Sequence, residues 1–393
     1  MQFLRSYRMN AREQALTRLR QFAPMAGRHY AARRNDDLGP GQHTHVSCLS
    51  SFVRHRVISE TEILSEVLKH HSPEAAEKFV AEVFWRGYFK GWLEMRPFAW
   101  HELTTHHEWQ KEDVFAGLRV GPGRFGIACM NDWHRELVET GYLHNHARMW
   151  FASIWIFTLA LPWQAGARLF MEHLKDGDPA SNTLSWRWVA GIHTIGKHYL
   201  ARADNIERCT AGRVVVDEDL NETADALPCS EHPTPKRIEN QTALPQKNGL
   251  LILHDDDLDG DQYWQNLLEP QQTIVVNMAN KRAENMSMDV CQFVDQLCAQ
   301  SAMAHGGGRV LLQAEEVVKM FQASGANHVV VPHAPVGPNA LFVQELCRML
   351  ESQGVPLEQP MRRYDELVWP HAKKGFFPVK KQIPTILQEL GLV

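Results

Sequence analysis

The residues best suited to chemistry crowd into positions 140–188 of the 393-residue chain. Five tryptophans lie in this stretch, together with five notable polar residues: Asn145, Arg148, Asp176, Asp178 and Asn182. Few chemistries use an arginine–carboxylate pair, a lone amide and a line of indoles together, and light-driven flavin chemistry is one of them. The stretch is therefore the first candidate for a functional site.

The apolar spacing predicts that residues 1–212 are mainly helical. An amphipathic helix is expected near the start, where Ala15, Leu16, Leu19 and Phe22 recur at helical spacing. Further helices are predicted over residues 58–71, 75–94, 132–163 (one or two helices) and 166–175. These helices would position the side chains of the 140–188 stretch.

Residues 213–247 are polar and acidic and carry four prolines, which predicts a linker between two domains. After the linker, short apolar runs alternate with helical stretches over residues 248–393. This alternation predicts a smaller, Rossmann-like α/β domain with a parallel sheet and helices on both faces. Its strands are expected at residues 250–253, 273–276, 309–312 and 328–331, with a fifth at 355–359. The fifth strand would lie at an edge, because Pro356 cannot donate a ladder hydrogen bond.

The composition is typical of a globular protein with room for two domains, with 44% hydrophobic and 22% charged residues. The net charge of −5 conceals an asymmetry, since residues 1–210 hold 26 basic and 22 acidic side chains. Ten of the twelve tryptophans also lie before residue 190. The first part is therefore the one expected to meet a polyanion.

Seven cysteines without a Cys-x-x-Cys pair argue against a disulfide framework and favour a reducing cytoplasm. No apolar run reaches the roughly 18 residues of a membrane span, so no membrane partner is expected. Residues 255–260 look like half of a calcium loop, but Asn266 stands where the last ligand is needed. We therefore expect no metal site.

With these elements in place, the 140–188 stretch resembles the flavin-binding core of the DNA photolyase/cryptochrome family. Residues 144–149, His-Asn-His-Ala-Arg-Met, are similar to that family's Met-His-Asn-Arg-x-Arg-Met element. The resemblance implies that FAD is the cofactor and that Arg148 pairs with Asp176 beside the isoalloxazine. The implied polar contacts of the FAD in this stretch are Asn145, Arg148, Asp176, Asp178 and Asn182.

Asn182 matches the residue that lies next to flavin N5 in the photolyases. An amide there can hydrogen-bond a flavin that carries a proton on N5, so it favours a photolyase-like protein over plant and insect cryptochromes. His146, by contrast, argues against DNA repair, because it takes the place of an arginine that often points to DNA phosphate in this family.

Residues 82–86, Glu-Val-Phe-Trp-Arg, resemble the family's Glu-Leu-x-Trp-Arg helix. Glu82, Trp85 and Arg86 share one face of the predicted helix. The resemblance implies that Glu82 hydrogen-bonds the bases of a pyrimidine dimer, that Trp85 stacks on them and that Arg86 contacts FAD. From the residues alone, an amphipathic core helix with an ion pair at its rim is the alternative.

Residues 46–50, Val-Ser-Cys-Leu-Ser, resemble the serine-rich loop that opens a helix and binds the FAD phosphates in this family. Val46 and Arg56 depart from the usual threonine and glycine, and an ordinary Ser-capped helix is the alternative. A Tyr-x-x-x-Arg element, residues 30–34, is implied on the same side of the cofactor. The implied contacts of the FAD phosphate side are Tyr30, Ser47, Leu49 and Ser50.

The resemblance divides the tryptophans between two roles. Trp188, with Met149, would form the wall of the lesion pocket opposite Trp85. An electron relay between flavin and surface would use Trp186, Trp163 and Trp109, with Trp100 as the alternative last member. Taken singly, each indole is more often a core residue than a relay.

The α/β part comes last in this chain, whereas in photolyases it comes first. Residues 251–258 resemble the opening strand and turn of that domain, with acidic residues in place of arginines, and residues 375–381 resemble its end. The resemblance thus implies a circularly permuted chain, a rearrangement that costs little where chain ends lie close together. It leaves open whether an antenna pigment is bound.

Taken as a whole, the resemblance implies a FAD-dependent, blue-light-driven enzyme that repairs cyclobutane pyrimidine dimers. The expected partner is damaged DNA, single- or double-stranded, bound by a monomer that flips the dimer into its pocket. The alternatives are a cryptochrome-like photoreceptor without repair activity and a flavin-binding relic without either function.

Overall fold

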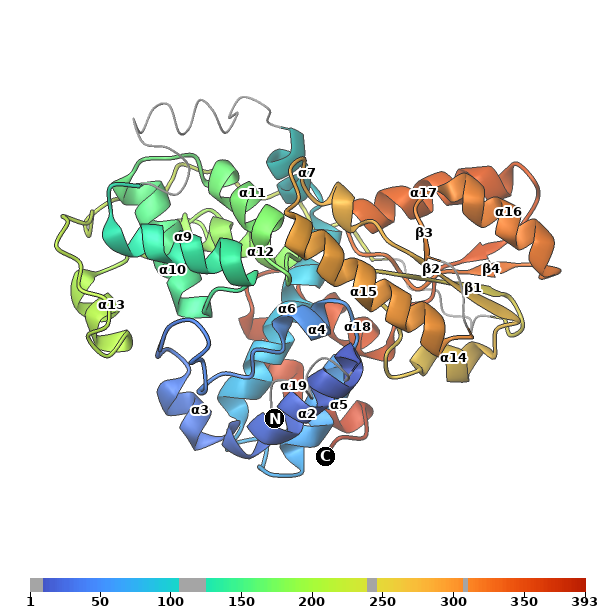
Figure 1. Cartoon of the computed structure of the whole chain (residues 1–393), viewed down its shortest axis with the longest axis horizontal. Coiled ribbons are helices and arrows are strands. Elements are labelled where there is room, and N and C mark those ends of the chain that lie inside the picture. The colour runs from blue at the N-terminus through green and yellow to red at the C-terminus, as the bar shows by residue number, and fades with distance from the viewer. Residues whose placement is uncertain (1–9, 106–124, 239–245, 307–309) are drawn as a thin grey trace.

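The computed structural model describes residues 10–105, 125–238, 246–306 and 310–393, and Figure 1 gives the element labels. Helices dominate the first half of the chain, as the apolar spacing predicted. Their bounds are α2 Ala11–Phe22, α3 Arg28–Arg33, α4 Ser50–Arg54, α5 Glu60–Leu68, α6 Glu77–Met95, α7 Phe98–Thr105, α9 Ala128–Thr140, α10 Asn145–Ser153, α11 Trp163–His173, α12 Pro179–Val189 and α13 Ala203–Cys209. None of the described helices combines the length and apolarity needed to cross a membrane.

The predicted helices form, and local sequence explains where they stop. The helix at the start buries Ala15, Leu19 and Phe22, the apolar face read from the spacing. The 132–163 region becomes two helices, α9 and α10, because Gly141 ends the first in the left-handed conformation (φ 69°) that favours glycine. A short π-helical segment, Ile154–Thr158, then extends α10.

The second half of the chain contains a five-stranded parallel sheet of order β3-β2-β1-β4-β5. The strands are β1 Leu250–His254, β2 Gln272–Val276, β3 Val310–Leu311, β4 Val329–Val330 and β5 Leu357–Glu358. The predicted parallel sheet is confirmed, and β5 lies at an edge. The helices of this part are α14 Tyr263–Leu268, α15 Met288–Ala304, α16 Ala314–Ser324 and α17 Pro338–Glu351.

Successive residues of β1 pack into two different hydrophobic cores, because side chains alternate between the two faces of a strand. Leu251 and Leu253 belong to a large cluster that includes α15 and is continuous with the helical part. Leu250 and Ile252 belong to a separate cluster with α16 and α17. The sheet is therefore covered on both faces, and one of its faces is joined to the core of the helical part.

The last helices of the chain leave the sheet and pack against α6. These are α18 Arg363–Val368 and α19 Phe377–Glu389. Figure 1 shows both in red among the blue helices of the first part. We retain residues 1–212 and 248–393 as proposed domains, with α18 and α19 lying on the surface of the first.

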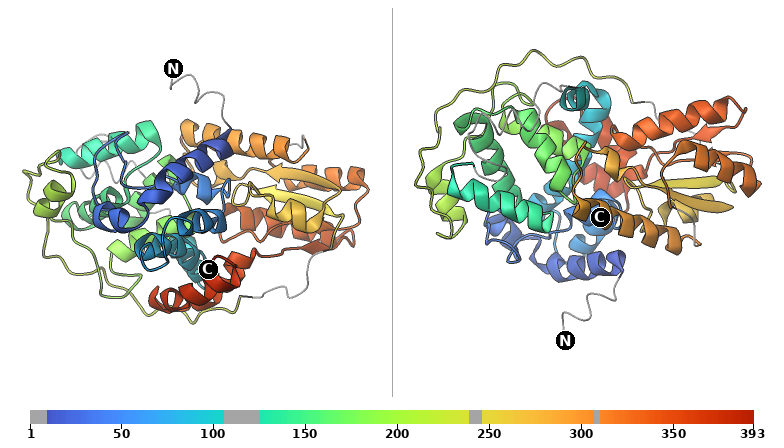
Figure 2. Two further views of the ribbon diagram at one scale, coloured as in Figure 1. Left: turned by 90° about the horizontal axis from the view of Figure 1, so that it is seen from below. Right: turned by 45° about the horizontal axis from the view of Figure 1, so that its top comes forward.

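The described residues of the predicted linker, 213–238 and 246–247, contain no helix or strand. They form an ordered strap along the helical part, visible as the long yellow-green trace in Figure 2. The Leu227 amide donates to the Ala190 carbonyl at 3.0 Å, and the Lys236 amide to the Met95 carbonyl at 3.0 Å. Residues 213–238 thereby lie across the helical part rather than away from it.

Candidate flavin site

The first element of the site is the predicted ion pair between α10 and the acidic turn. The Arg148 guanidinium donates from Nη2 to Asp176 Oδ2 at 3.0 Å and from Nε to the Leu143 carbonyl at 2.8 Å. This pairing is confirmed. Asp176 Oδ1 is buried and has no hydrogen-bond partner among the described residues. Because an unpaired buried oxygen costs about 1–3 kcal/mol, it is suited to a ligand that donates a hydrogen bond.

Asp178 is a buried carboxylate surrounded by cations. Its Oδ1 caps α12 by accepting from the Ser181 amide at 2.8 Å. Its Oδ2 lies 3.2 Å from Arg86, 3.4 Å from Lys90 and 3.7 Å from Arg54. Burial alone would raise the pKa of Asp178, but Lys90, Arg86 and Arg54 together hold it well below the usual range.

Lys90 and Arg54 were not singled out from the sequence. Lys90 lies one turn after Arg86, a spacing that does place two side chains on one helix face. Arg54 lies far from Asp178 in the chain and carried no comparable signal. The structure therefore assigns Asp178 a role in holding α4, α6 and α12 together beside the site.

Asn182 follows Asp178 by one turn of α12 and is buried. Its side chain donates from Nδ2 to the Ala167 carbonyl at 2.8 Å. A carbonyl can only accept, so this bond fixes the amide with Oδ1 pointing the other way. Asn182 Oδ1 is then suited to accept a hydrogen bond, as the prediction about flavin N5 requires.

The serine-rich segment lies beside the Arg148–Asp176 pair. The Cys48 thiol contacts the Tyr142 hydroxyl at 3.7 Å, and the Arg148 guanidinium lies over the Tyr142 ring at 5.6 Å. Ser50 begins α4, and its hydroxyl is buried without a hydrogen-bond partner among the described residues. The segment thus contributes a second polar atom suited to a ligand.

For the other residues predicted on the FAD phosphate side, the structure shows only how they are buried and packed. Leu49 is buried, Ser47 is half-buried, and Tyr30 packs between Phe22 and Phe79 at ring distances of 5.9 and 5.2 Å. Burial, and then the nearby Glu82 carboxylate, raise the pKa of Tyr30. Their contacts with FAD stay predictions.

The side chains predicted to share one face of helix α6 have different surroundings in the structure. Arg86 turns inward, to Asp178 and to Glu60 at 3.6 Å. Trp85 stacks on Phe376 with a ring distance of 4.1 Å and an interplanar angle of 14°. Glu82 is 44% exposed and lies 4.0 Å from Arg34. Partial loss of hydration raises the pKa of Glu82, and the positive charges of Arg34 and Lys78 lower it by a smaller amount.

The predicted opposite wall has its own stacking partner. Trp188 lies parallel to Tyr199 at a ring distance of 6.1 Å, while Trp85 lies on Phe376. On α10, Met149 is half-buried and Asn145 is exposed at the first position of the helix. A shared pocket between Trp85 and Trp188 stays a prediction.

The tryptophan cluster contains a member that was not predicted from the sequence. Trp186 packs edge-to-face on Phe170 at 5.1 Å and on Trp155 at 6.2 Å. Trp155 donates its indole N–H to the Pro162 carbonyl at 2.8 Å. No motif or spacing marked Trp155, because its contact with Trp186 joins two helices.

The other relay candidates differ in their surroundings. Trp163 begins α11 and carries the Arg187 guanidinium over its ring at 5.4 Å. Trp100 is buried on α7, and Trp109 lies outside the described residues. The order of an electron relay stays a prediction.

Arg54 connects the site with the α/β part. Besides approaching Asp178, it forms a buried hydrogen bond to Asp256 in the turn after β1. Next to it, Arg282 binds Asp255 at 2.9 Å. The acidic turn noted in the sequence is thus neutralised by buried arginines.

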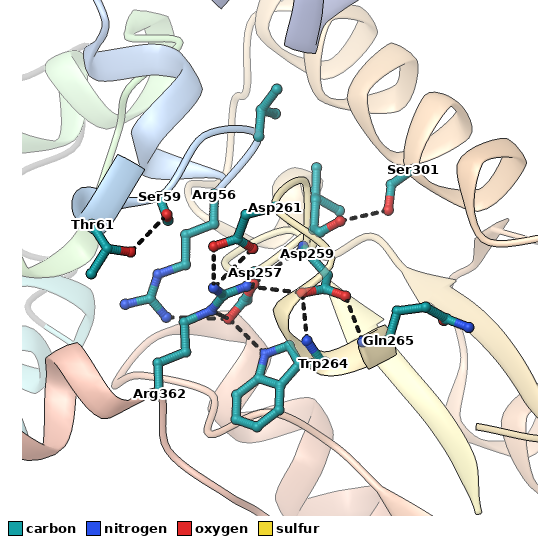
Figure 3. A network of polar contacts seen from close by, with 12 residues as sticks. Arg56, Ser59, Thr61, Asp257, Asp259, Asp261, Trp264, Gln265, Ser301 and Arg362 are labelled. Atoms are coloured by element: carbon teal, nitrogen blue, oxygen red, sulfur yellow. Dashed lines mark hydrogen bonds and ion pairs between the residues drawn. The ribbon is translucent and has the colours of Figure 1, made fainter. Parts of the chain in front are cut away.

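Arg56 forms a second connection, drawn in Figure 3. Its guanidinium lies 3.3 Å from Glu60, 3.2 Å from Asp257 and 2.6 Å from Asp365. Arg56 has φ 47°, in the left-handed region that glycine adopts more easily, which explains why a glycine is common here. The two departures noted in the sequence, Arg56 and the acidic turn, are therefore partners in one interface.

Comparison with known proteins identifies the helical part. Residues 79–212 match the FAD binding domain of DNA photolyase. The deoxyribodipyrimidine photo-lyase of Streptomyces griseus is 34% identical over 150 residues, which are 38% of this chain and 33% of that protein. That of Thermus thermophilus is 32% identical over 189 residues, 46% of this chain and 42% of that protein. The chain thus spans between a third and about two fifths of these relatives.

Solved structures of two similar proteins overlap about half of the chain. A Synechocystis cryptochrome is 21% identical with a TM-score of 0.43, covering 51% of this chain and 43% of its own. A class III photolyase from Agrobacterium tumefaciens is 24% identical with a TM-score of 0.41, covering 51% and 42%. Through its helical part, the chain is similar to the FAD binding domain of DNA photolyase.

Proposed function

We propose that this protein is a FAD-dependent, blue-light-driven photolyase that repairs cyclobutane pyrimidine dimers in DNA by electron transfer from reduced flavin. The observation that carries the proposal is the buried Asp176 Oδ1, which lies beside the Arg148 guanidinium and has no hydrogen-bond partner in the described part of the chain. Together with Asn182 Oδ1 and the Ser50 hydroxyl, it offers polar atoms that FAD can satisfy. The bound FAD would supply the light-absorbing electron donor.

The residues divide into three groups in this proposal. The FAD would be held by Tyr30, Ser47, Leu49, Ser50, Arg86, Asn145, Arg148, Asp176, Asp178 and Asn182. Trp85, Trp188 and Met149 would enclose the flipped dimer, with apolar surface replacing the stacking that the dimer loses in DNA. Glu82 would hydrogen-bond the dimer bases through its carboxyl group.

The proposal is tested by illuminating the reduced protein with dimer-containing DNA and measuring recovered thymine. We expect a flavin absorption spectrum and light-dependent recovery. Asp176→Ala is expected to lose bound flavin and recovery together, whereas Asp132→Ala, at a surface carboxylate that is 54% exposed, keeps both. Flavin binding without recovery would reject the repair activity, and absence of flavin would reject the site.

Trp186→Phe is expected to abolish photoreduction of oxidised flavin, because phenylalanine keeps the packing but does not readily give up an electron. The measurement is transient absorption of the flavin after a blue pulse. Trp155→Phe is the matched variant, since Trp155 is a buried indole packed against Trp186 that the proposed relay does not use. An unchanged rate in Trp186→Phe would exclude a relay through this residue.

A photoreceptor without repair activity is the second candidate. It is favoured by the buried ion pairs that run from Asp178 through Arg54 to Asp256, because they connect the site with the α/β part. Light-dependent association with a protein partner, in the absence of thymine recovery, would support this candidate over repair.

A further inference from the structure

The segment before and into α19 forms a basic and aromatic surface beside Trp85. We call it the 373–381 surface, and its members are Lys373, Lys374, Phe376, Phe377 and Lys381. The segment reaches α6 although it lies almost 300 residues later in the chain. It is therefore placed at the proposed lesion pocket by tertiary packing alone.

The backbone of this segment is held against α6. Arg96 Nη2 donates to the Lys373 carbonyl at 2.7 Å, and the Tyr88 hydroxyl donates to the Lys374 carbonyl at 2.9 Å. Both lysine side chains are exposed. The main chain is thus fixed on the protein side while two ammonium groups remain in solvent.

Two aromatic rings continue the surface. Phe376 lies flat on Trp85 at 4.1 Å, which extends the Trp85 stack toward α19. Phe377 is 64% exposed, an unusual position for a large apolar side chain. The Lys381 ammonium lies 4.8 Å from the centre of the Phe377 ring.

The charge of the surface is not neutralised within the described residues. Lys373, Lys374 and Lys381 form no ion pair with a described carboxylate, whereas the neighbouring Lys380 binds Glu77 at 2.7 Å. One ammonium group beside an exposed phenyl ring, with two further exposed lysines shortly before it in the chain, suits a polyanion that carries flat bases. An acidic peptide would match the charges but would leave the ring without a stacking partner.

We propose that the 373–381 surface binds single-stranded nucleic acid next to the base held at Trp85. Lys373, Lys374 and Lys381 contact phosphates of the flanking strand, and Phe377 stacks on a neighbouring base. The position of the strand rests on the proposed function, because Trp85 is the residue proposed to receive the flipped base. The contacts themselves require neither flavin nor light.

The test uses an undamaged single-stranded oligonucleotide in the dark, with binding measured by fluorescence anisotropy at several salt concentrations. Each lost phosphate contact lowers the slope of log K against log salt by about 0.7 for a single strand. The triple variant Lys373→Ala, Lys374→Ala, Lys381→Ala should therefore lower the slope by about 2. Phe377→Ala should weaken binding by between about 5-fold and 150-fold with little change in slope.

The control is Lys281→Ala with Lys319→Ala, which removes two exposed lysines of the α/β part. It should leave the slope unchanged, and circular dichroism should show that every variant is folded. An unchanged slope in the folded triple variant would overturn the proposal, as would equal loss of binding to an acidic peptide and to the oligonucleotide.

The outcome is independent of the repair assay. If thymine recovery fails but the slope falls as expected, the nucleic-acid surface stands and the repair activity does not. If recovery is normal at saturating DNA and the slope is unchanged, the repair activity stands and the surface is rejected.

Discussion

Replacing Asp178 with alanine should destabilise the protein by about 3–5 kcal/mol, the usual cost of removing one partner from a buried ion pair. Asp178 is 1% exposed and is shared by Arg86, Lys90 and Arg54. The variant leaves all three cations near one another without their common anion, and it also removes the cap of α12. Urea unfolding followed by circular dichroism measures the loss.

Asp178→Asn separates charge from shape. Asparagine can still cap α12 through Oδ1, so the stability lost in Asp178→Asn measures the effect of the missing charge. The additional stability lost in Asp178→Ala measures the effect of the cap, typically about 1 kcal/mol. An asparagine variant as stable as the original protein would contradict the electrostatic role of Asp178.

The stability of the original protein and that of Asp178→Asn should depend differently on pH. The pKa of Asp178 is held below its unfolded value, about 3.9, so the carboxylate stabilises the fold above that pH. This stability is lost progressively as the pH falls below about 4, because the unfolded carboxyl then takes up a proton first. The asparagine variant should lose less stability over the same interval.

Replacing Arg56 with alanine should have an effect of similar size, about 3–5 kcal/mol. The guanidinium is buried among Glu60, Asp257 and Asp365, and Figure 3 shows Arg362 as the remaining cation near Asp257. Without Arg56, Glu60 keeps only Arg86 among the described cations, at 3.6 Å, and Asp365 loses the cation that binds it at 2.6 Å. Thermal unfolding should show a lower midpoint. Limited proteolysis should cut the variant earlier between the helical and α/β parts.

Arg56→Gly is the matched variant, since it removes the same charge but accepts the backbone conformation. Because residue 56 has φ 47°, the Arg56→Ala variant should be less stable than the Arg56→Gly variant by about 1–2 kcal/mol. Equal stability of the two variants would contradict backbone strain, and an unchanged midpoint in both would contradict the ionic role of Arg56.

The sequence predicted the parts of the site that lie on single elements or in one motif. The Arg148–Asp176 pair could be predicted because the family resemblance implies it, and Arg86 could be placed on one helix face with Glu82 and Trp85 from their spacing. The approach of Arg54 to Asp178 and of Trp155 to Trp186 could not, since those contacts join elements whose relative position depends on the whole core.

The fold was predicted in a similar way. Apolar runs indicated all five strands, although β3, β4 and β5 each pair over only two residues, so their ends could not be placed. The sequence also assigned residues 363–389 to the α/β domain. Their packing against α6 is decided by tertiary contacts such as the Trp85–Phe376 stack, which leave no periodic signal in the chain.

The Arg56 interface has a consequence for how the protein forms in the cell. Asp257 follows Arg56 by 201 residues and Asp365 by 309, so the ribosome supplies the arginine long before its partners. At about 5–20 residues per second, the wait for Asp365 is roughly 15–60 s. During that time the newly made helices cannot bury Arg56 at acceptable cost. We therefore expect the final core to close only after synthesis has passed α18, which makes folding of this chain a late, whole-molecule event.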